Sequence, residues 1–117
     1  MMSEIKVFDL TGKNAISMQS GGRFFGVLQS RLVSEDVIIV NFEGVELFAS
    51  PFFNASIGLL LKDISIDKLQ QKLSIINLSD VGRDLLNHVI SNAIAFYEDG
   101  DKVSRAIDQA RSGDVNE

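Results

Sequence analysis

Two serines, Ser50 and Ser56, have the residue type and the surroundings that suit a regulated chemical step. Ser50 directly precedes Pro51, and this pair predicts a helix with Ser50 as N-cap and Pro51 as its first residue. A helix start favours negative charge because its free N–H groups point outward. Ser50 is therefore either a plain N-cap or a phosphoacceptor, whose phosphate would add about two negative charges and repel a docked acidic or apolar partner. Ser56, further along the same helix, is the weaker candidate phosphoacceptor.

The loop before this helix carries Glu43 and Glu46 on either side of Gly44. These carboxylates either form an acidic rim beside Ser50 that attracts a basic partner, or are simply solvated loop residues. In both interpretations, the junction between the preceding strand and the helix is where a function must be sought.

Other polar residues do not form a catalytic or metal-binding pattern. His88 is the only histidine, and a general base would need a nucleophile and an orienting partner beside it, so a solvated surface histidine is expected. The carboxylates towards the C-terminus match no calcium-loop spacing; they are Asp80, Asp84, Glu98, Asp99 and Asp101. We therefore expect no enzyme activity, no cofactor and no metal.

Length and composition indicate one globular domain. A chain of 117 residues, 45% hydrophobic and 23% charged, can form a core without disulfides. Cysteine is absent, which excludes disulfide and thiolate chemistry and is in keeping with a reducing cytoplasm. The N-terminus lacks the pattern of a signal peptide. We therefore expect a cytoplasmic protein.

Charge and hydropathy also restrict the partners. The net charge is −5 and the eleven Lys and Arg residues are scattered, whereas a nucleic-acid surface needs clustered positive charge. No apolar run approaches the ~20 residues that span a membrane. Neither a nucleic acid nor a membrane is expected as a partner.

The chain is organised around residues 37–53. The apolar run Val37-Ile38-Ile39-Val40 predicts a strand buried on both faces. The loop with the two glutamates follows, and then the helix that begins at the Ser-Pro pair. The sequence thus predicts a strand, a short exposed loop and a helix start in direct succession.

Before this stretch, we expect a hairpin and a helix. Residues 5–10 and 15–18 read as two strands joined by the turn at 11–14, and residues 23–33 have helical spacing. Gly21-Gly22 is expected to be a flexible start to that helix, because the pattern of a phosphate loop is missing.

After it, the helix at 51–64 has a core stripe and a second apolar strip of Phe52, Ala55 and Leu59. This strip is either covered within the molecule or meets a partner. A strand at 73–78 and a long helix at 81–97, capped by Ser79-Asp80, complete the domain.

The element order is therefore ββαβαβα, with a short C-terminal helix considered at 102–111. Alternating strands and helices imply right-handed crossovers and a largely parallel sheet. We expect an α/β fold with a four-stranded mixed sheet and helices mainly on one face. The domain would span 1–100, and 101–117 would be a helical or frayed tail.

This pattern resembles the STAS-like family, small domains related to anti-sigma factor antagonists and including the STAS-like domains of unknown function of the DUF4325 type. The resemblance rests on Asn41-Phe42-Glu43-Gly44-Val45, then Ser50-Pro51-Phe52-Phe53, and on the strand and turn Ile75 to Ser79. It covers about residues 5 to 97. Antagonists of this family carry Asp-Ser-Ser/Thr-Gly at the junction and are phosphorylated on the second hydroxyl. Here Ser50 matches the first hydroxyl and Pro51 the usual acceptor, so binding is the expected mode of action.

The resemblance implies a non-enzymatic regulatory domain in a partner-switching system. Its partner would be a histidine-kinase-type ATPase or an anti-sigma-like regulator. The expected contact surface is formed by Glu43, Glu46, Ser50, Phe52, Ala55, Ser56 and Leu59. One alternative is a small structural or oligomeric subunit of a larger assembly, whose helix at 51–64 packs against its own copy; the sequence leaves both a monomer and a homodimer open. A nucleotide-binding module that uses Gly21-Gly22 or the helix start is the other.

Overall fold

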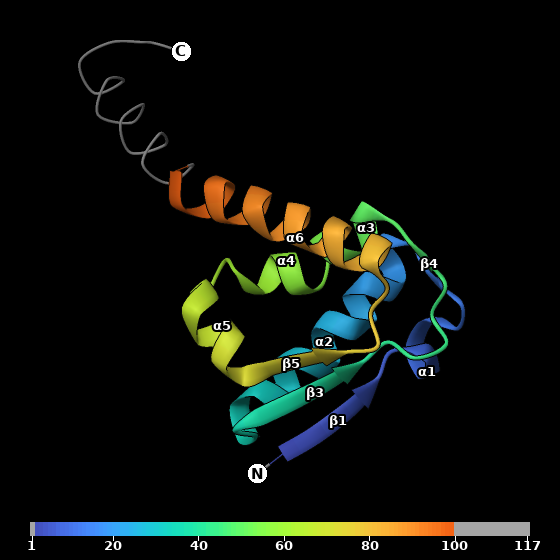
Figure 1. The fold of residues 1–117 in the computed structure, drawn as a ribbon. Coiled ribbons are helices and arrows are strands. Elements are labelled where there is room, and N and C mark those ends of the chain that lie inside the picture. The colour runs from blue at the N-terminus through green and yellow to red at the C-terminus, as the bar shows by residue number, and fades with distance from the viewer. Residues whose placement is uncertain (1, 100–117) are drawn as a thin grey trace, which may run out of the picture.

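The computed structural model describes residues 2–99, and these form a small α/β domain (Figure 1). The strands are β1 (Met2–Lys6), β2 (Asn14–Ala15), β3 (Val37–Asn41), β4 (Leu47–Phe48) and β5 (Leu73–Ile76). The helices are α1 (Phe8–Thr11), α2 (Met18–Ser34), α3 (Ser50–Asn54), α4 (Ile57–Leu60), α5 (Ile66–Lys72) and α6 (Asp80–Ile94), which a π-helical turn, Ala95–Asp99, extends. The expected domain boundary at residue 100, the tail and its helix at 102–111 lie outside the described residues.

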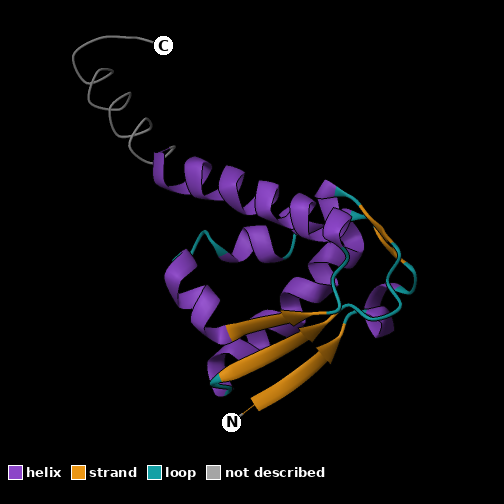
Figure 2. Ribbon diagram, viewed as in Figure 1, coloured by secondary structure: helices purple, strands orange, loops and turns teal. Residues whose placement is uncertain are grey.

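The main sheet has three parallel strands in the order β1-β3-β5, and not the four mixed strands expected. β1 pairs with β3 along its whole length, from Met2 opposite Val37 to Lys6 opposite Asn41. Strands added in chain order by crossovers of one hand keep their helices on one face. The helices accordingly gather on one side of the sheet (Figure 2).

The expected N-terminal hairpin is wrong. Val7 has helical backbone angles and begins α1, because its carbonyl accepts the N–H groups of Leu10 and Thr11. β2 then pairs in parallel with β4, with Ala15 opposite Phe48. Parallel pairing with the apolar strand β3 buries Ile5, which a local hairpin between two weakly patterned segments would not do.

Helix α2 begins earlier than expected, so Gly21-Gly22 is not a flexible turn. The Ser17 hydroxyl accepts the N–H of Ser20 at 3.0 Å and caps the helix upstream of both glycines. A Cβ atom on Gly21 would lie 2.5 Å from the carbonyl oxygen of Phe52, so glycine permits α2 to touch α3. With both glycines inside a helix, the turn expected for a nucleotide does not exist.

The single helix expected at 51–64 is broken into α3 and α4. Ser56 has non-helical angles (φ −122°, ψ −96°) and its hydroxyl donates to the Phe52 carbonyl at 2.7 Å. This break turns α4 towards α6, where a Cβ on Gly58 would lie 3.0 Å from a Val89 methyl. Close packing between α4 and α6 thus outweighs the regular apolar spacing of residues 51–64, which predicted one continuous helix.

The last strand and helix are close to expectation. β5 occupies the first four residues of the expected strand at 73–78. α6 starts after Ser79, whose hydroxyl accepts the Gly82 N–H at 3.1 Å. The polar connection at 65–72 forms α5, with Ser65 accepting the Lys68 N–H as its cap.

A cluster of phenylalanines forms the centre of the core. Phe24 of α2 stacks on Phe52 of α3 with ring centroids 5.6 Å apart, and meets Phe42 edge to face. Phe53 packs against both Phe42 and Phe52. All four side chains are fully buried, so Phe42, which follows β3, packs firmly against α2 and α3.

No helix of the described range 2–99 covers the other face of the sheet. Ile38 and Val40 point towards the helices and are fully buried, whereas Val37 and Ile39, on the opposite face, are only partly buried. The central strand is therefore buried on one face, not on both as expected.

Candidate functional site

Asn41, the last residue of β3, organises the point where the chain leaves the sheet. Its side-chain amide donates to a Glu4 carboxylate oxygen at 2.8 Å, and its carbonyl oxygen accepts from the Asn77 amide at 2.9 Å. The same oxygen accepts the backbone N–H of Glu43 at 2.9 Å. One side chain thus connects the middle of β1 to the C-terminal ends of β3 and β5. The loop that follows starts from a fixed position.

The loop from Phe42 to Ala49 is held at several further points. Gly44 has φ +90° and lies against Phe8, which a Cβ atom would approach to 2.9 Å. Two successive N–H groups, those of Glu46 and Leu47, donate to the Lys13 carbonyl at 2.8 and 3.0 Å. The loop is therefore a rigid frame on which exposed side chains keep their positions.

Strand alternation along β4 exposes one apolar residue and buries the next. Phe48 points inward and stacks on Phe53 at 5.9 Å, whereas Leu47 points outward and is 56% exposed. β2 lies beside it and leads to Ile16 and Met18, which are 40% and 68% exposed. Leu47 and Ile16 thus belong to paired segments, with Met18 following at the start of α2, and together they are candidates for one shared apolar surface.

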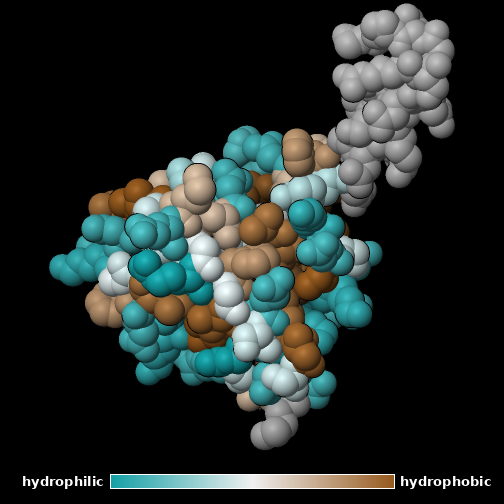
Figure 3. Space-filling model, turned by 180° about the vertical axis from the view of Figure 1, so that it is seen from behind, coloured by the Kyte–Doolittle hydropathy of each residue, from teal (hydrophilic) through white to brown (hydrophobic). Residues whose placement is uncertain are grey.

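We call this region the junction surface, and define it by Ile16, Met18, Glu43, Glu46, Leu47 and Ser50. Both glutamates are exposed at its margin and Ser50 is half-buried. In the rear view, hydrophobic and hydrophilic side chains alternate over the molecule, and hydrophobic ones reach the edge where β2 and β4 lie (Figure 3). The sequence indicated the three polar members. Leu47 and Ile16 lie in or beside strands of only two residues, which are too short for an alternating apolar pattern to show that these side chains are exposed.

The structure separates the other predicted partner-binding residues from this surface. Phe52 is fully buried against Phe24, so its expected place in an exposed strip is wrong. Ser56 is also fully buried. Ala55, at the end of α3, and Leu59, in α4, lie on either side of the break and are both half-buried. The break rotates this strip away from where a continuous helix would place it.

The two candidate phosphoacceptors differ in environment. Ser56 is enclosed and its hydroxyl is engaged with the Phe52 carbonyl. Ser50 is partly accessible but is not the N-cap: Ala49 has the extended cap conformation (φ −143°, ψ 154°), and no side chain caps α3. The cap is displaced because the Ala49 N–H continues the β2–β4 pairing by donating to Ala15. The Ser50 hydroxyl is thus not committed to capping.

Remote from the junction, residues 2–99 contain neither a cluster that could hold a metal ion nor a helix that could span a membrane. His88 is exposed on α6, as expected. Within residues 2–99, no group of three or more His, Asp or Glu side chains is placed to hold a metal ion. None of the helices in this range is long and apolar enough to cross a membrane.

Comparison with known proteins agrees with this architecture. Residues 20–83, more than half of the chain, match a family described as a STAS-like domain of unknown function (DUF4325). Neither the curated proteins nor the solved structures include a match to the chain. The matched range runs from α2 into α6 and contains β3, the junction and β5. The chain therefore belongs to the family of STAS-like domains of unknown function, DUF4325.

Proposed function

We propose that this domain is a non-enzymatic regulatory module of the anti-sigma factor antagonist type, which binds a protein partner through the junction surface. The observation that supports this most directly is the exposure of Leu47, Ile16 and Met18 on a rigid frame beside two glutamates. A flat apolar centre with a charged margin is typical of a protein-binding surface.

The apolar members of the junction surface would supply most of the affinity. Full burial of a leucine side chain contributes about 1.5–3 kcal/mol, which is enough to make Leu47 a dominant contact. Glu43 and Glu46 lie at the margin, where charges mainly accelerate association and select a partner of opposite sign. A basic patch around an apolar pocket is therefore the complementary surface.

We further propose a histidine-kinase-type ATPase or an anti-sigma-like regulator as the partner. Family membership supports this class, and the accessible Ser50 supports regulation at the same surface. Phosphorylation of Ser50 would place about two negative charges beside Leu47 and disfavour apolar docking. Ser56 cannot be modified without opening the fold, so a phosphate found on Ser56 of the folded protein would contradict this assignment.

The test is a binding titration between the full chain and purified ATPases and regulators of this class from the same genome. Leu47→Asp should weaken binding by at least about tenfold, or roughly 1.4 kcal/mol. Phe96→Asp is the matched control, because Phe96 is also an exposed apolar residue but lies beyond the far end of α6. Equal affinities for all three proteins would rule out the junction surface as the binding site.

A further inference from the structure

Within residues 2–99, strand β1 is an edge of the main sheet and its outer backbone groups have no strand partner. The Val7 N–H donates to the Asn41 carbonyl, so the alternate residues Ser3 and Ile5 also direct their backbone groups towards β3. Glu4 and Lys6 direct theirs outward. Among the described residues, the outward Glu4 carbonyl meets only a long 3.3 Å bond from Arg31. An edge of this kind is a template for another strand.

Helix α2 runs beneath this edge and has a stripe of small residues on its outer side. Gly22, Gly26 and Ser30 are spaced by four residues, so they lie along one face, and all three are exposed. A Cβ atom on Gly22 or Gly26 would meet no atom of another described element within 4 Å. Glycine is a poor residue for the interior of a helix, and contacts with the described residues do not account for either one. A close approach by another molecule would account for both.

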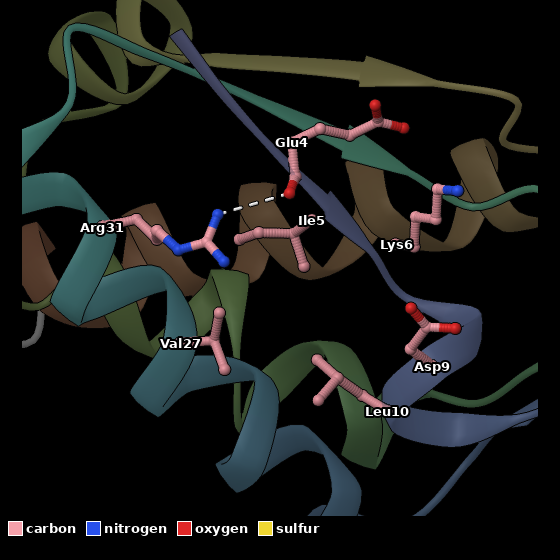
Figure 4. A pocket seen from close by; sticks show the side chains of 7 residues that line it. All are labelled: Glu4, Ile5, Lys6, Asp9, Leu10, Val27 and Arg31. Atoms are coloured by element: carbon pink, nitrogen blue, oxygen red, sulfur yellow. Dashed lines mark hydrogen bonds between the residues drawn. The ribbon is translucent and has the colours of Figure 1, made fainter. Parts of the chain in front are cut away.

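The edge and the stripe lie on the same side of the molecule. A hollow of about 470 Å³ is bounded by β1, α1 and α2, with Arg31 at the end near Glu4 and Asp9 at the end near Lys6 (Figure 4). A second hollow, of about 530 Å³, shares Leu10, Val27 and Arg31 with the first and extends over Gly26 and Ser30. Ile5 of β1 and Val27 of α2, the sequence neighbour of Gly26, line the same hollow, so the middle of β1 lies near the middle of the stripe.

We propose that this side binds a second copy of the same chain, with the two β1 strands paired antiparallel about a two-fold axis at Ile5. Glu4 of each copy then lies directly opposite Lys6 of the other, and both residues have outward backbone groups, as a hydrogen-bonded pair requires. The pairing joins two three-stranded sheets into one sheet of six strands.

The same two-fold axis also explains the stripe of small residues on α2 and the opposite charges at the two ends of the hollow. It runs each α2 antiparallel to its copy near Gly26, and the small residues permit the two backbones to approach closely. The hollows of the two copies then run in opposite directions, which brings Arg31 of one copy towards Asp9 of the other. The complementarity is therefore of the chain with itself, which favours a second copy over an unrelated strand.

The proposal is tested by sedimentation equilibrium of the full chain over a wide range of concentration. Wild type should dimerise reversibly. Lys6→Glu places glutamates opposite each other and should weaken the dimer by about tenfold or more, while the Glu4→Lys/Lys6→Glu double variant should recover most of the affinity. Gly26→Leu should give a monomer. Because leucine forms helices better than glycine, the melting temperature of Gly26→Leu should not lie below that of wild type when both are compared at a concentration low enough to keep them monomeric, which separates dissociation from misfolding.

His88→Leu, an exposed substitution on α6, is the matched control and should dimerise like wild type. A wild type that stays monomeric at every concentration would overturn the proposal. So would Lys6→Glu and Gly26→Leu variants that associate as tightly as wild type. A double variant as weak as Lys6→Glu alone would overturn the proposed register.

Discussion

Phe52 illustrates how a residue chosen for a surface role serves the core instead. Its ring stacks on Phe24 and packs edge to face on Phe53 at 5.3 Å, and it is fully buried. It therefore joins α2 to α3 at the start of the helix that carries Ser50. Its contribution to function is to fix the junction, while contact with a partner falls to exposed neighbours such as Leu47.

We expect Phe52→Ala to lower the free energy of unfolding by about 3–5 kcal/mol, because it empties a ring-sized volume in a packed core. Urea denaturation followed by circular dichroism measures this. Phe96→Ala is the control: Phe96 is 69% exposed, and a change of no more than about 0.5 kcal/mol is expected. A Phe52→Ala variant as stable as wild type would show that the aromatic cluster is not packed as described.

At the scale of elements, α2 contains two adjacent glycines with opposite surroundings. Gly21 faces the Phe52 carbonyl and the Ala55 side chain, whereas Gly22 faces open space. Both residues are equally poor helix formers, so any difference between them must come from packing. Comparing substitutions at the two positions therefore distinguishes the effect of helix propensity, which they share, from the effect of tertiary contact, which only Gly21 makes.

Gly21→Ala should destabilise the fold by about 1–3 kcal/mol, because the new methyl group meets backbone that cannot move aside. Gly22→Ala should stabilise it by about 0.5–1 kcal/mol through helix propensity alone. Thermal unfolding of both variants, at a concentration low enough to keep the chain monomeric, provides the comparison. Similar shifts of the same sign would contradict the close contact between α2 and α3.

At the scale of the whole fold, the strand order β1-β3-β5 leaves one face of a parallel sheet without helices from the part of the chain that the structure describes. Parallel sheets are usually covered on both faces. Here polar residues take part of that role: Glu4, Asn41 and Asn77 are joined by hydrogen bonds across the three strands. Neighbouring residues of β3 therefore contribute to stability very unequally.

Ile38→Ala should cost about 2–5 kcal/mol, because Ile38 is fully buried against the helices. Ile39→Ala, on the open face, should cost about 1 kcal/mol. Chemical denaturation of the two variants gives the difference directly. Equal losses would mean that the open face is covered, for instance by another chain.

The sequence by itself determined the features that depend on local chemistry. Ser79 predicted the start of α6, and the apolar runs predicted β3 and β5, because caps and periodicity act within a few residues. The element order, together with the stretches Asn41 to Val45, Ser50 to Phe53 and Ile75 to Ser79, was enough to indicate the family. Glu43 and Glu46 were placed correctly at the surface because the loop that carries them is polar.

Only the tertiary structure decided which residues face solvent at the junction. Whether Phe52 was buried depended on Phe24, far away in the chain, and the helix break at Ser56 depended on how α4 packs against α6. Leu47 became exposed because β4 pairs with β2, two strands of two residues each that have no periodicity to read. Long-range packing overrides local pattern at these positions because the apolar area it buries outweighs helix propensity.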